Sequence, residues 1–251
     1  CVVCVPERPV ACDEKPGKIS DMFKALFKND QAMTVVVSII LVYTSLNICG
    51  NLVLYFFRFD VGNEGAYSIF AAVAFAAQVL VMMVIPLLRK RFSKSQLFIS
   101  GFIIQIAGFA VILIMAFAKL YTPQSWYILC LPGILIYLGY GMLNVIMTIF
   151  LSDSVDYGEV MNGTREESVI FSMQTFTVKL ASGVAVFLAG LVVDWIHLDT
   201  AAAVQTQDTL DALRMWMTIP SVILLIVGIF VFKRFYKLDD TRMEEIKSKL
   251  N

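Results

Sequence analysis

Side chains that could carry out chemistry are sparse in this chain. It has one histidine, His197, and five cysteines, of which Cys1 and Cys4 form a C-x-x-C motif. Such a motif can be a redox pair or half of a zinc site, but no second pair accompanies it. We therefore interpret these cysteines as small packing residues. The sequence contains no recognisable nucleophile–base pair and no phosphate-binding glycine-rich loop, so we do not expect an enzyme or a cofactor.

Lys179 stands near the middle of a long apolar stretch that contains no acidic residue. A charge at the centre of a bilayer costs at least about 2.5–3.5 kcal/mol, and such residues usually face a cavity and mark function. Gln174 lies one position away from a stripe of small and polar residues that shares the helical face of Lys179. The stripe consists of Ser168, Ser172, Thr175, Ser182 and Gly190. Either burial deprotonates Lys179, or another segment supplies its counter-charges.

Two other apolar stretches carry weaker polar stripes of amides, hydroxyls and glycines. The first comprises Tyr43, Asn47, Gly50 and Asn51, and the second comprises Tyr137, Gly141, Asn144 and Thr148. Small and polar residues also hold membrane helices together. The sequence alone leaves open whether these stripes line a pathway or pack against neighbouring helices.

A predicted loop over 152–167 gathers charged side chains. Asp153 and Asp156 lie three residues apart at the end of a helix, and Arg165 follows closely. These residues could form a cluster of salt bridges that is made or broken as helix bundles move relative to one another. Metal binding by the two aspartates is the alternative, but no histidine or third ligand has suitable spacing. We therefore expect no metal site.

The elements that position these residues follow from composition. Hydrophobic residues make up 59% of the 251 residues and charged residues 16%, with a mean hydropathy of +0.77. Soluble domains carry roughly 25% charged residues. Six stretches are long enough to cross a bilayer as helices: 31–57, 66–88, 97–118, 126–151, 168–193 and 215–232. They are too long and too uniformly apolar for barrel strands. The zero net charge gives no indication of a nucleic-acid partner.

The distribution of basic residues predicts the orientation. Sixteen of the twenty Lys and Arg residues lie in the N-terminal segment, the second and fourth connections and the C-terminal tail, so we place both termini in the cytoplasm. Trp126, Trp195 and Trp216 then fall at the outer interface. We expect 1–30 to hold the end of a preceding helix and a loop with an amphipathic helix over 19–27. Residues 31–233 form the bundle, and 234–251 form a tail with a solvated helix over 242–250.

Several runs resemble the glycoside–pentoside–hexuronide:cation symporters. They are 153–159 with Arg165, 171–179, 28–31 before the first span, and 235–238 after the last. The resemblance implies an all-α membrane protein of the major-facilitator type, in which this chain is the C-terminal six-helix bundle. Its partner would be an N-terminal six-helix half of the same transporter, which would supply most ligands of a coupling cation, Na⁺ or H⁺.

The resemblance also implies roles for particular residues. Lys179 would lie near the cation and sugar sites and contact acids of the N-terminal half, with Gln174 and Thr175 beside the sugar. Some relatives carry an aromatic residue near the sugar where this chain has Asn144. The candidate substrate and cation site therefore comprises Lys179, Thr175, Gln174, Asn144, Tyr140, Asn47 and Asn51. The candidate cytoplasmic gate comprises Asp153, Asp156, Arg165, Tyr157 and Glu167.

The function indicated by these patterns is that of one half of a cation-coupled sugar symporter in the cell membrane, working by alternating access. One alternative is the same fold carrying another solute, such as a drug, a glycoside conjugate or a lysolipid. Another is a membrane scaffold of six helices without transport activity.

Overall fold

The computed structural model describes residues 27–163, 167–202, 204–238 and 240–250, and within these ranges the chain is helical with no strand. The elements are α2 (Asp30–Tyr55), its π-helical extension η1 (Phe56–Asp60), α3 (Ala66–Leu88), α4 (Lys94–Phe117), the 3₁₀ turn η2 (Trp126–Leu129), α5 (Cys130–Asn162), α6 (Glu167–Trp195), α7 (Gln207–Phe235) and α8 (Asp240–Leu250). The helix predicted over 19–27 lies almost entirely outside the described residues.

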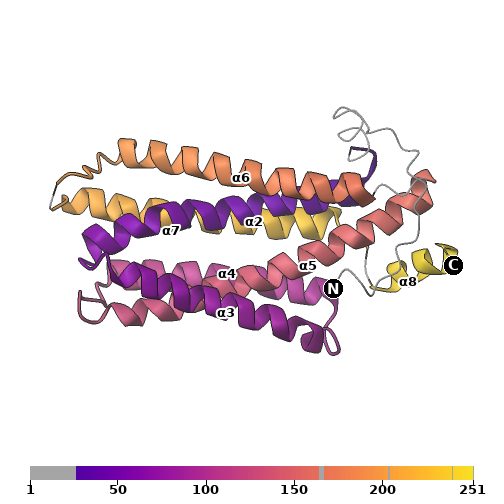
Figure 1. Ribbon diagram of the computed structural model, residues 1–251, viewed down its shortest axis with the longest axis horizontal. Helices are drawn as coiled ribbons and strands as arrows, with labels where there is room; N and C mark the ends of the chain where they lie inside the picture. Colours follow the sequence, from indigo (N-terminus) through magenta and orange to yellow (C-terminus); the bar gives the residue numbers. More distant parts are fainter. Residues whose placement is uncertain (1–26, 164–166, 203, 239, 251) are drawn as a thin grey trace, which may run out of the picture.

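Six of these helices, α2 to α7, are long and apolar enough to cross a membrane (Figure 1). This confirms the prediction of an all-α membrane protein with six spans, and the chain is a multi-pass membrane protein. Hydrocarbon offers no hydrogen bonds to the backbone, so helices that satisfy their own amides are one of only two folds that can span it.

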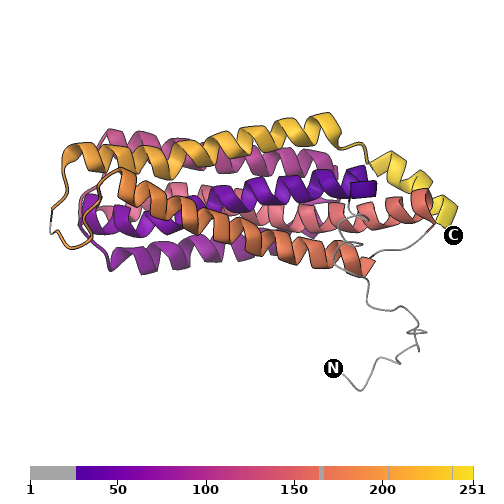
Figure 2. The same ribbon diagram turned by 90° about the horizontal axis from the view of Figure 1, so that it is seen from above.

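The helices are interlocked around two central members, α2 and α5. Helix α2 packs mainly against α6 and α7, whereas α5 packs mainly against α3 and α4, and α4 also contacts α7. Each central helix therefore packs chiefly on helices from the opposite half of the chain (Figures 1 and 2). Such an arrangement is typical of the inverted three-helix repeats found within major-facilitator halves.

Glycines allow α4 and α5 to approach closely. A Cβ atom on Gly139 would lie 2.5 Å from the backbone oxygen of Gly101 and 2.6 Å from the backbone nitrogen of Gln105. A Cβ atom on Gly108 would lie 2.7 Å from the side chain of Ile136. Close backbone contact at small residues supplies much of the packing energy between membrane helices.

Two helices extend well past the predicted spans. Helix α5 continues to Asn162 and ends at Gly163, which has a φ of 73°, so most of the predicted loop over 152–167 is helical. Helix α7 begins at Gln207, where Thr206 caps it by accepting a hydrogen bond from the Thr209 amide. Hydropathy falls where charged residues begin, but a helix can continue beyond the hydrocarbon. The sequence pattern therefore ended α5 too early, at 151, and began α7 too late, at 215.

The C-terminal helix α8 is packed rather than fully solvated, so the prediction for this tail was wrong. Met243 and Ile246 are buried, together with Leu238 ahead of the helix, in a small cluster with Tyr157 and Tyr236. Alternating charges along 242–250 concealed the three-residue spacing of these two apolar side chains.

We expect Gly139→Ala to destabilise the protein by about 1–3 kcal/mol, because the added methyl group meets backbone atoms that cannot move aside. The measurement is the thermal unfolding midpoint in detergent. Gly183→Ala in α6 is the control, since a Cβ atom there meets no atom within 4 Å. Equal midpoints for the two variants would contradict the close α4–α5 contact.

Candidate functional site

A hydrogen bond joins the polar stripes of the two central helices. The Asn144 amide on α5 donates to the hydroxyl of Tyr43 on α2 at 2.7 Å. The Tyr43 ring packs edge-on against the Tyr140 ring with centroids 5.5 Å apart, and Tyr137 extends this aromatic group. Two of the predicted site residues, Asn144 and Tyr140, therefore lie together, with Tyr43 between them.

Helix α6 reaches the same group through Gln174. Its Nε2 atom donates to the Thr148 hydroxyl at 3.5 Å, and that hydroxyl donates to the backbone oxygen of Asn144 at 3.1 Å. Thr148 is exposed, and Gln174 and Asn144 are half-buried. Amide and hydroxyl groups from α5 and α6 thus line one accessible surface.

The two asparagines predicted on α2 continue this surface along the helix. Asn47 donates to the backbone oxygen of Tyr43 at 2.7 Å, and Asn51 donates to that of Asn47 at 2.7 Å. Asn51 also lines a groove between α2 and α6 with Gly190 and Asp194. Each asparagine uses one amide hydrogen on its own helix, which leaves the amide oxygen and a second hydrogen for another partner.

Helix α6 has one face packed on α2 and one open face. The packed face carries Met173, Thr177 and three alanines, which are buried. The open face carries Lys179 and Thr175, which are both exposed, together with Ser168, Ser172 and Gly190. The helical stripe predicted around Lys179 therefore lies on the surface of α6 that faces away from α2.

Lys179 makes no hydrogen bond or ion pair with any residue that the structure describes. It lies twelve residues after Glu167 and sixteen before Trp195, roughly 18 Å and 24 Å from the two ends of α6. Neither headgroup region is within easy reach of its side chain from this depth. An ammonium group at this position requires water or a carboxylate from outside the described residues.

At the end of the bundle where α2 begins, Asp153 is buried in an ion pair with Lys94 of α4. Asp240 at the start of α8 lies 3.4 Å from the same ammonium group and 3.5 Å from the guanidinium of Arg89. Asp153, assigned to a loop from the sequence, therefore belongs to α5. These charges join α8 to the neighbouring ends of α4 and α5.

The other predicted gate residues divide into two groups. Tyr157 packs against α8 and lies near the carboxylate of Asp30 at the start of α2. Asp156 is half-buried on α5 and Glu167 is exposed in the first turn of α6. Arg165 lies outside the described residues, so its predicted pairing stays a prediction.

At the opposite end of the bundle, Arg214 of α7 forms a second buried cluster. It donates to both carboxylate oxygens of Asp60 at 2.8 and 2.5 Å, and to Asp211 at 2.7 Å. The Tyr121 hydroxyl donates to Asp60 at 2.6 Å. Burial, followed by its contact with Asp60, raises the pKa of Tyr121, so the phenol stays protonated and remains a donor.

Sequence reasoning placed these paired charges in loops and recognised Lys179 as the single charge within a span. The side chains of Lys94 and Arg214 are only 7% and 3% exposed. Their partners lie 59 and 154 residues away along the chain. Spacing within one helix gives no signal for such pairs, although a charge close to a predicted span is a reason to look for one.

No group of three or more His, Cys, Asp or Glu side chains in the described part of the chain could hold a metal ion. The free cysteines there, Cys49 and Cys130, lie within α2 and at the start of α5. Among exposed aliphatic side chains of α6, the accessible polar groups of the predicted site are amides, hydroxyls and the ammonium group of Lys179. Their chemistry suits reversible recognition of a polar, uncharged or anionic solute rather than bond cleavage.

The chain matches the family described as MFS/sugar transport protein over residues 5–240, and it belongs to this family. It is 25% identical to the uncharacterized symporter YjmB of Bacillus subtilis (strain 168), covering 93% of this chain and 49% of the relative. It is 23% identical to the raffinose carrier protein of Pediococcus pentosaceus, covering 92% of this chain and 35% of the carrier. It is 25% identical to the isoprimeverose transporter of Lactiplantibacillus pentosus, covering 90% and 46%.

The family assignment confirms the major-facilitator fold and the resemblance to glycoside–pentoside–hexuronide:cation symporters. It also confirms the prediction that the chain is not an enzyme, since these relatives are transporters. The chain spans less than half the length of each of these three relatives.

We expect Asp60→Asn to destabilise the protein by about 3–5 kcal/mol, because it leaves the buried guanidinium of Arg214 without its bidentate partner. The thermal unfolding midpoint in detergent measures the loss. Glu64→Gln removes a carboxylate from the exposed pair with Arg58, at 3.7 Å, and should change stability by less than about 1 kcal/mol. Similar losses in both variants would contradict a special role for the buried cluster.

Proposed function

We propose that this chain is the C-terminal half of a cation-coupled sugar symporter that works by alternating access. The observation that carries the proposal is Lys179, which lies on the open face of α6 and has no partner among the described residues, while Gln174 of the same helix joins a hydrogen-bonded polar surface from α2 and α5. The proposed partner is an N-terminal six-helix half of the same transporter. The membership of the family and the names of the relatives support this assignment.

The electrostatics of Lys179 argue for a partner with carboxylates. Leaving its ammonium group in hydrocarbon costs several kcal/mol, whereas a facing carboxylate or a water-filled cavity removes most of that cost. A coupling cation, Na⁺ or H⁺, would bind mainly to the same carboxylates. Lys179 and the cation then compete for the same carboxylates. A bound cation therefore changes the electrostatic interaction of Lys179 with these carboxylates, and this links cation binding to sugar binding. Through this coupling, the cation gradient can drive the uptake of the sugar.

The neighbouring groups suit a sugar. Gln174, Asn144 and Thr175 offer donors and acceptors for hydroxyl groups. The half-buried ring of Tyr43, held by the buried ring of Tyr140, offers a surface for the apolar face of a pyranose. Asn47 and Asn51 extend the polar surface along α2. The sugar would bind between the two halves near the middle of the membrane.

The charge clusters at the two ends suit a bundle that moves as one rigid body. Asp60 and Arg214 fasten α2 and its extension to α7, and Lys94 and Asp153 fasten α4 to α5. We assign Asp153, Asp156, Tyr157, Glu167 and Arg165 to a cytoplasmic gate, in which Asp153 anchors the gate through its buried pair with Lys94 and the others contact the other half when that side is closed. Rocking of two rigid halves about a central site is the usual form of alternating access.

We place the protein in the cell membrane with both termini in the cytoplasm. The bundle end with Arg89, Lys90, Arg91 and Lys94 is the more basic one, as the positive-inside rule requires of a cytoplasmic face. Trp195 and Trp216 contact each other at the opposite end, with ring centroids 5.2 Å apart, in keeping with an outer aromatic belt.

We expect Lys179→Gln in the full-length protein to abolish gradient-driven sugar accumulation in proteoliposomes while insertion and thermal stability stay intact. The reason is that the variant removes the charge that links the cation and sugar sites. Lys90→Gln removes an equivalent charge from the exposed basic end and should accumulate sugar normally. Normal accumulation by Lys179→Gln would rule out the central role of this lysine.

Tyr43→Phe should weaken sugar binding by about 2–10-fold, because Asn144 loses the acceptor that fixes its amide. Equilibrium binding of the transported sugar measures the change. Tyr137→Phe is the matched control, since the Tyr137 hydroxyl makes no hydrogen bond with the described residues. Equal affinities for wild-type protein and Tyr43→Phe would place the sugar elsewhere.

A further inference from the structure

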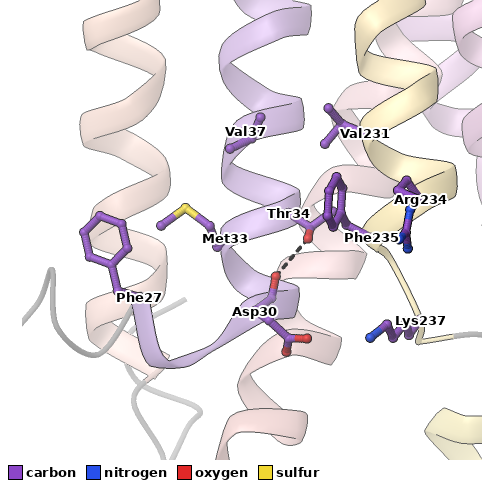
Figure 3. Close-up of a pocket in the computed structure, with 9 residues that line it drawn as sticks. All are labelled: Phe27, Asp30, Met33, Thr34, Val37, Val231, Arg234, Phe235 and Lys237. Carbon is purple, nitrogen blue, oxygen red and sulfur yellow. Dashed lines mark hydrogen bonds between the residues drawn. The ribbon is translucent and has the colours of Figure 1, made fainter.

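A groove outside the proposed transport site opens between α2 and α7 where α2 begins and α7 ends (Figure 3). Its volume of about 580 Å³ lies in the range of small-molecule sites. Met33 and Val37 of α2 and Val231 of α7 form its apolar wall. Arg234 and Lys237 stand at its open end, on the α7 side (Figure 3).

The two basic side chains at this groove have no counter-charge among the residues that the structure describes. Both are exposed, and neither forms an ion pair with a residue that the structure describes. The guanidinium of Arg234 lies over the Phe235 ring, 5.6 Å from its centroid, which leaves its donor groups available. Within the described part of the chain, the groove end therefore presents two exposed cations without an acidic partner.

The one acidic residue of the groove, Asp30, is already engaged elsewhere. Its Oδ2 atom accepts a hydrogen bond from the Gln31 side-chain amide at 2.9 Å, and its carboxylate lies near the Tyr157 hydroxyl. Asp30 therefore does not pair with Arg234 or Lys237. The groove keeps a net positive charge at its mouth.

The position of Lys237 is fixed before any ligand arrives. The backbone amide of Lys237 donates to the side-chain oxygen of Gln31 at 2.8 Å, and the Gln31 amide donates to the Phe235 backbone oxygen at 3.4 Å. Gln31 is 1% exposed, so these bonds are shielded from water. A preorganised backbone reduces the ordering cost of binding.

The depth of the groove decides what fits it. Val37 and Val231 lie inside the spans Asp30–Asp60 and Gln207–Phe235, whereas Arg234 is in the last turn of the second span and Lys237 lies two residues beyond it. The apolar wall is therefore at the level of acyl chains and the cations are at the level of headgroups. A soluble anion would satisfy the cations and leave the apolar wall uncovered.

We propose that this groove binds an anionic phospholipid. Its phosphodiester accepts hydrogen bonds from Arg234 and Lys237, and one acyl chain lies along Met33, Val37 and Val231. Basic pockets between helices at a headgroup boundary recognise anionic lipids by this combination of charge and apolar surface. The proposal goes beyond the transport function and does not depend on the identity of the solute.

The test is native mass spectrometry of the full-length protein titrated with phosphatidylglycerol and, separately, with zwitterionic phosphatidylethanolamine. We expect Arg234→Gln/Lys237→Gln to weaken phosphatidylglycerol binding roughly 20–30-fold and to leave phosphatidylethanolamine binding within about twofold. Lys90→Gln/Lys233→Gln is the matched control, since it removes two exposed charges that do not line the groove. The control should bind both lipids like the wild type.

A second variant tests the apolar wall. Val37→Trp fills the groove while keeping both cations, and it should displace phosphatidylglycerol but leave any binding of soluble glycerol phosphate unchanged. Thermal unfolding midpoints near the wild-type value show that each variant is folded.

Three outcomes would overturn the proposal. One is unchanged phosphatidylglycerol binding in both groove variants. This result is also expected if another protein segment, rather than a lipid, covers the groove. A second is an equal loss in the Lys90→Gln/Lys233→Gln control, which would indicate nonspecific surface charge. A third is an equal loss of both lipids in Arg234→Gln/Lys237→Gln, which would remove the role of headgroup charge.

Discussion

The hydrocarbon core of a bilayer cannot hydrate a polar side chain, and the buried charges and amides of this bundle are paired as that constraint requires. Lys94 and Arg214 satisfy it by pairing with aspartates from distant parts of the chain. Asn144 and Gln174 satisfy it through hydrogen bonds between helices. Lys179 has no such partner among the described residues and lies on an open surface. Under the proposed function, this exception separates the surface that would meet the other half and the solute from the surfaces that hold the bundle together.

The buried ion pairs and the polar surface have different roles because they use different shares of their hydrogen-bonding capacity within the bundle. A fully paired and hydrogen-bonded charge such as Arg214 is strongly tied to one arrangement of helices, since removing a partner leaves a buried charge exposed to hydrocarbon or protein. Asn47, Asn51 and Thr175 instead use only part of their hydrogen-bonding capacity on their own helix. A ligand that enters between two halves of a transporter needs groups of this second kind, because they can exchange partners at low cost.

Hydropathy and helical spacing predicted the features that depend on neighbours in sequence. The six spans and the common face of Lys179 and Thr175 are local properties of single helices, and the structure has them. The pair of Asn144 with Tyr43 joins residues 101 positions apart, which no periodicity can indicate. The extension of α5 past residue 151 was missed because a helix that leaves the hydrocarbon loses its apolar signal while keeping its backbone hydrogen bonds. The burial of α8 depends on a neighbouring helix, which a solvated pattern of charges does not reveal.

The interlocked order of the helices has a consequence for synthesis. Helix α2 is inserted first of the six, yet its main neighbours α6 and α7 emerge last, and its Ser45 carbonyl oxygen accepts a hydrogen bond from Ser221 of α7 at 2.8 Å. Until the ribosome has delivered α7, the surface of α2 that ends up buried stays open to lipid or to whatever assists insertion. Contacts of such high sequence separation form late and slowly. The bundle can therefore reach its final packing only when α7, the last membrane-spanning helix, packs against the surface of α2, the first.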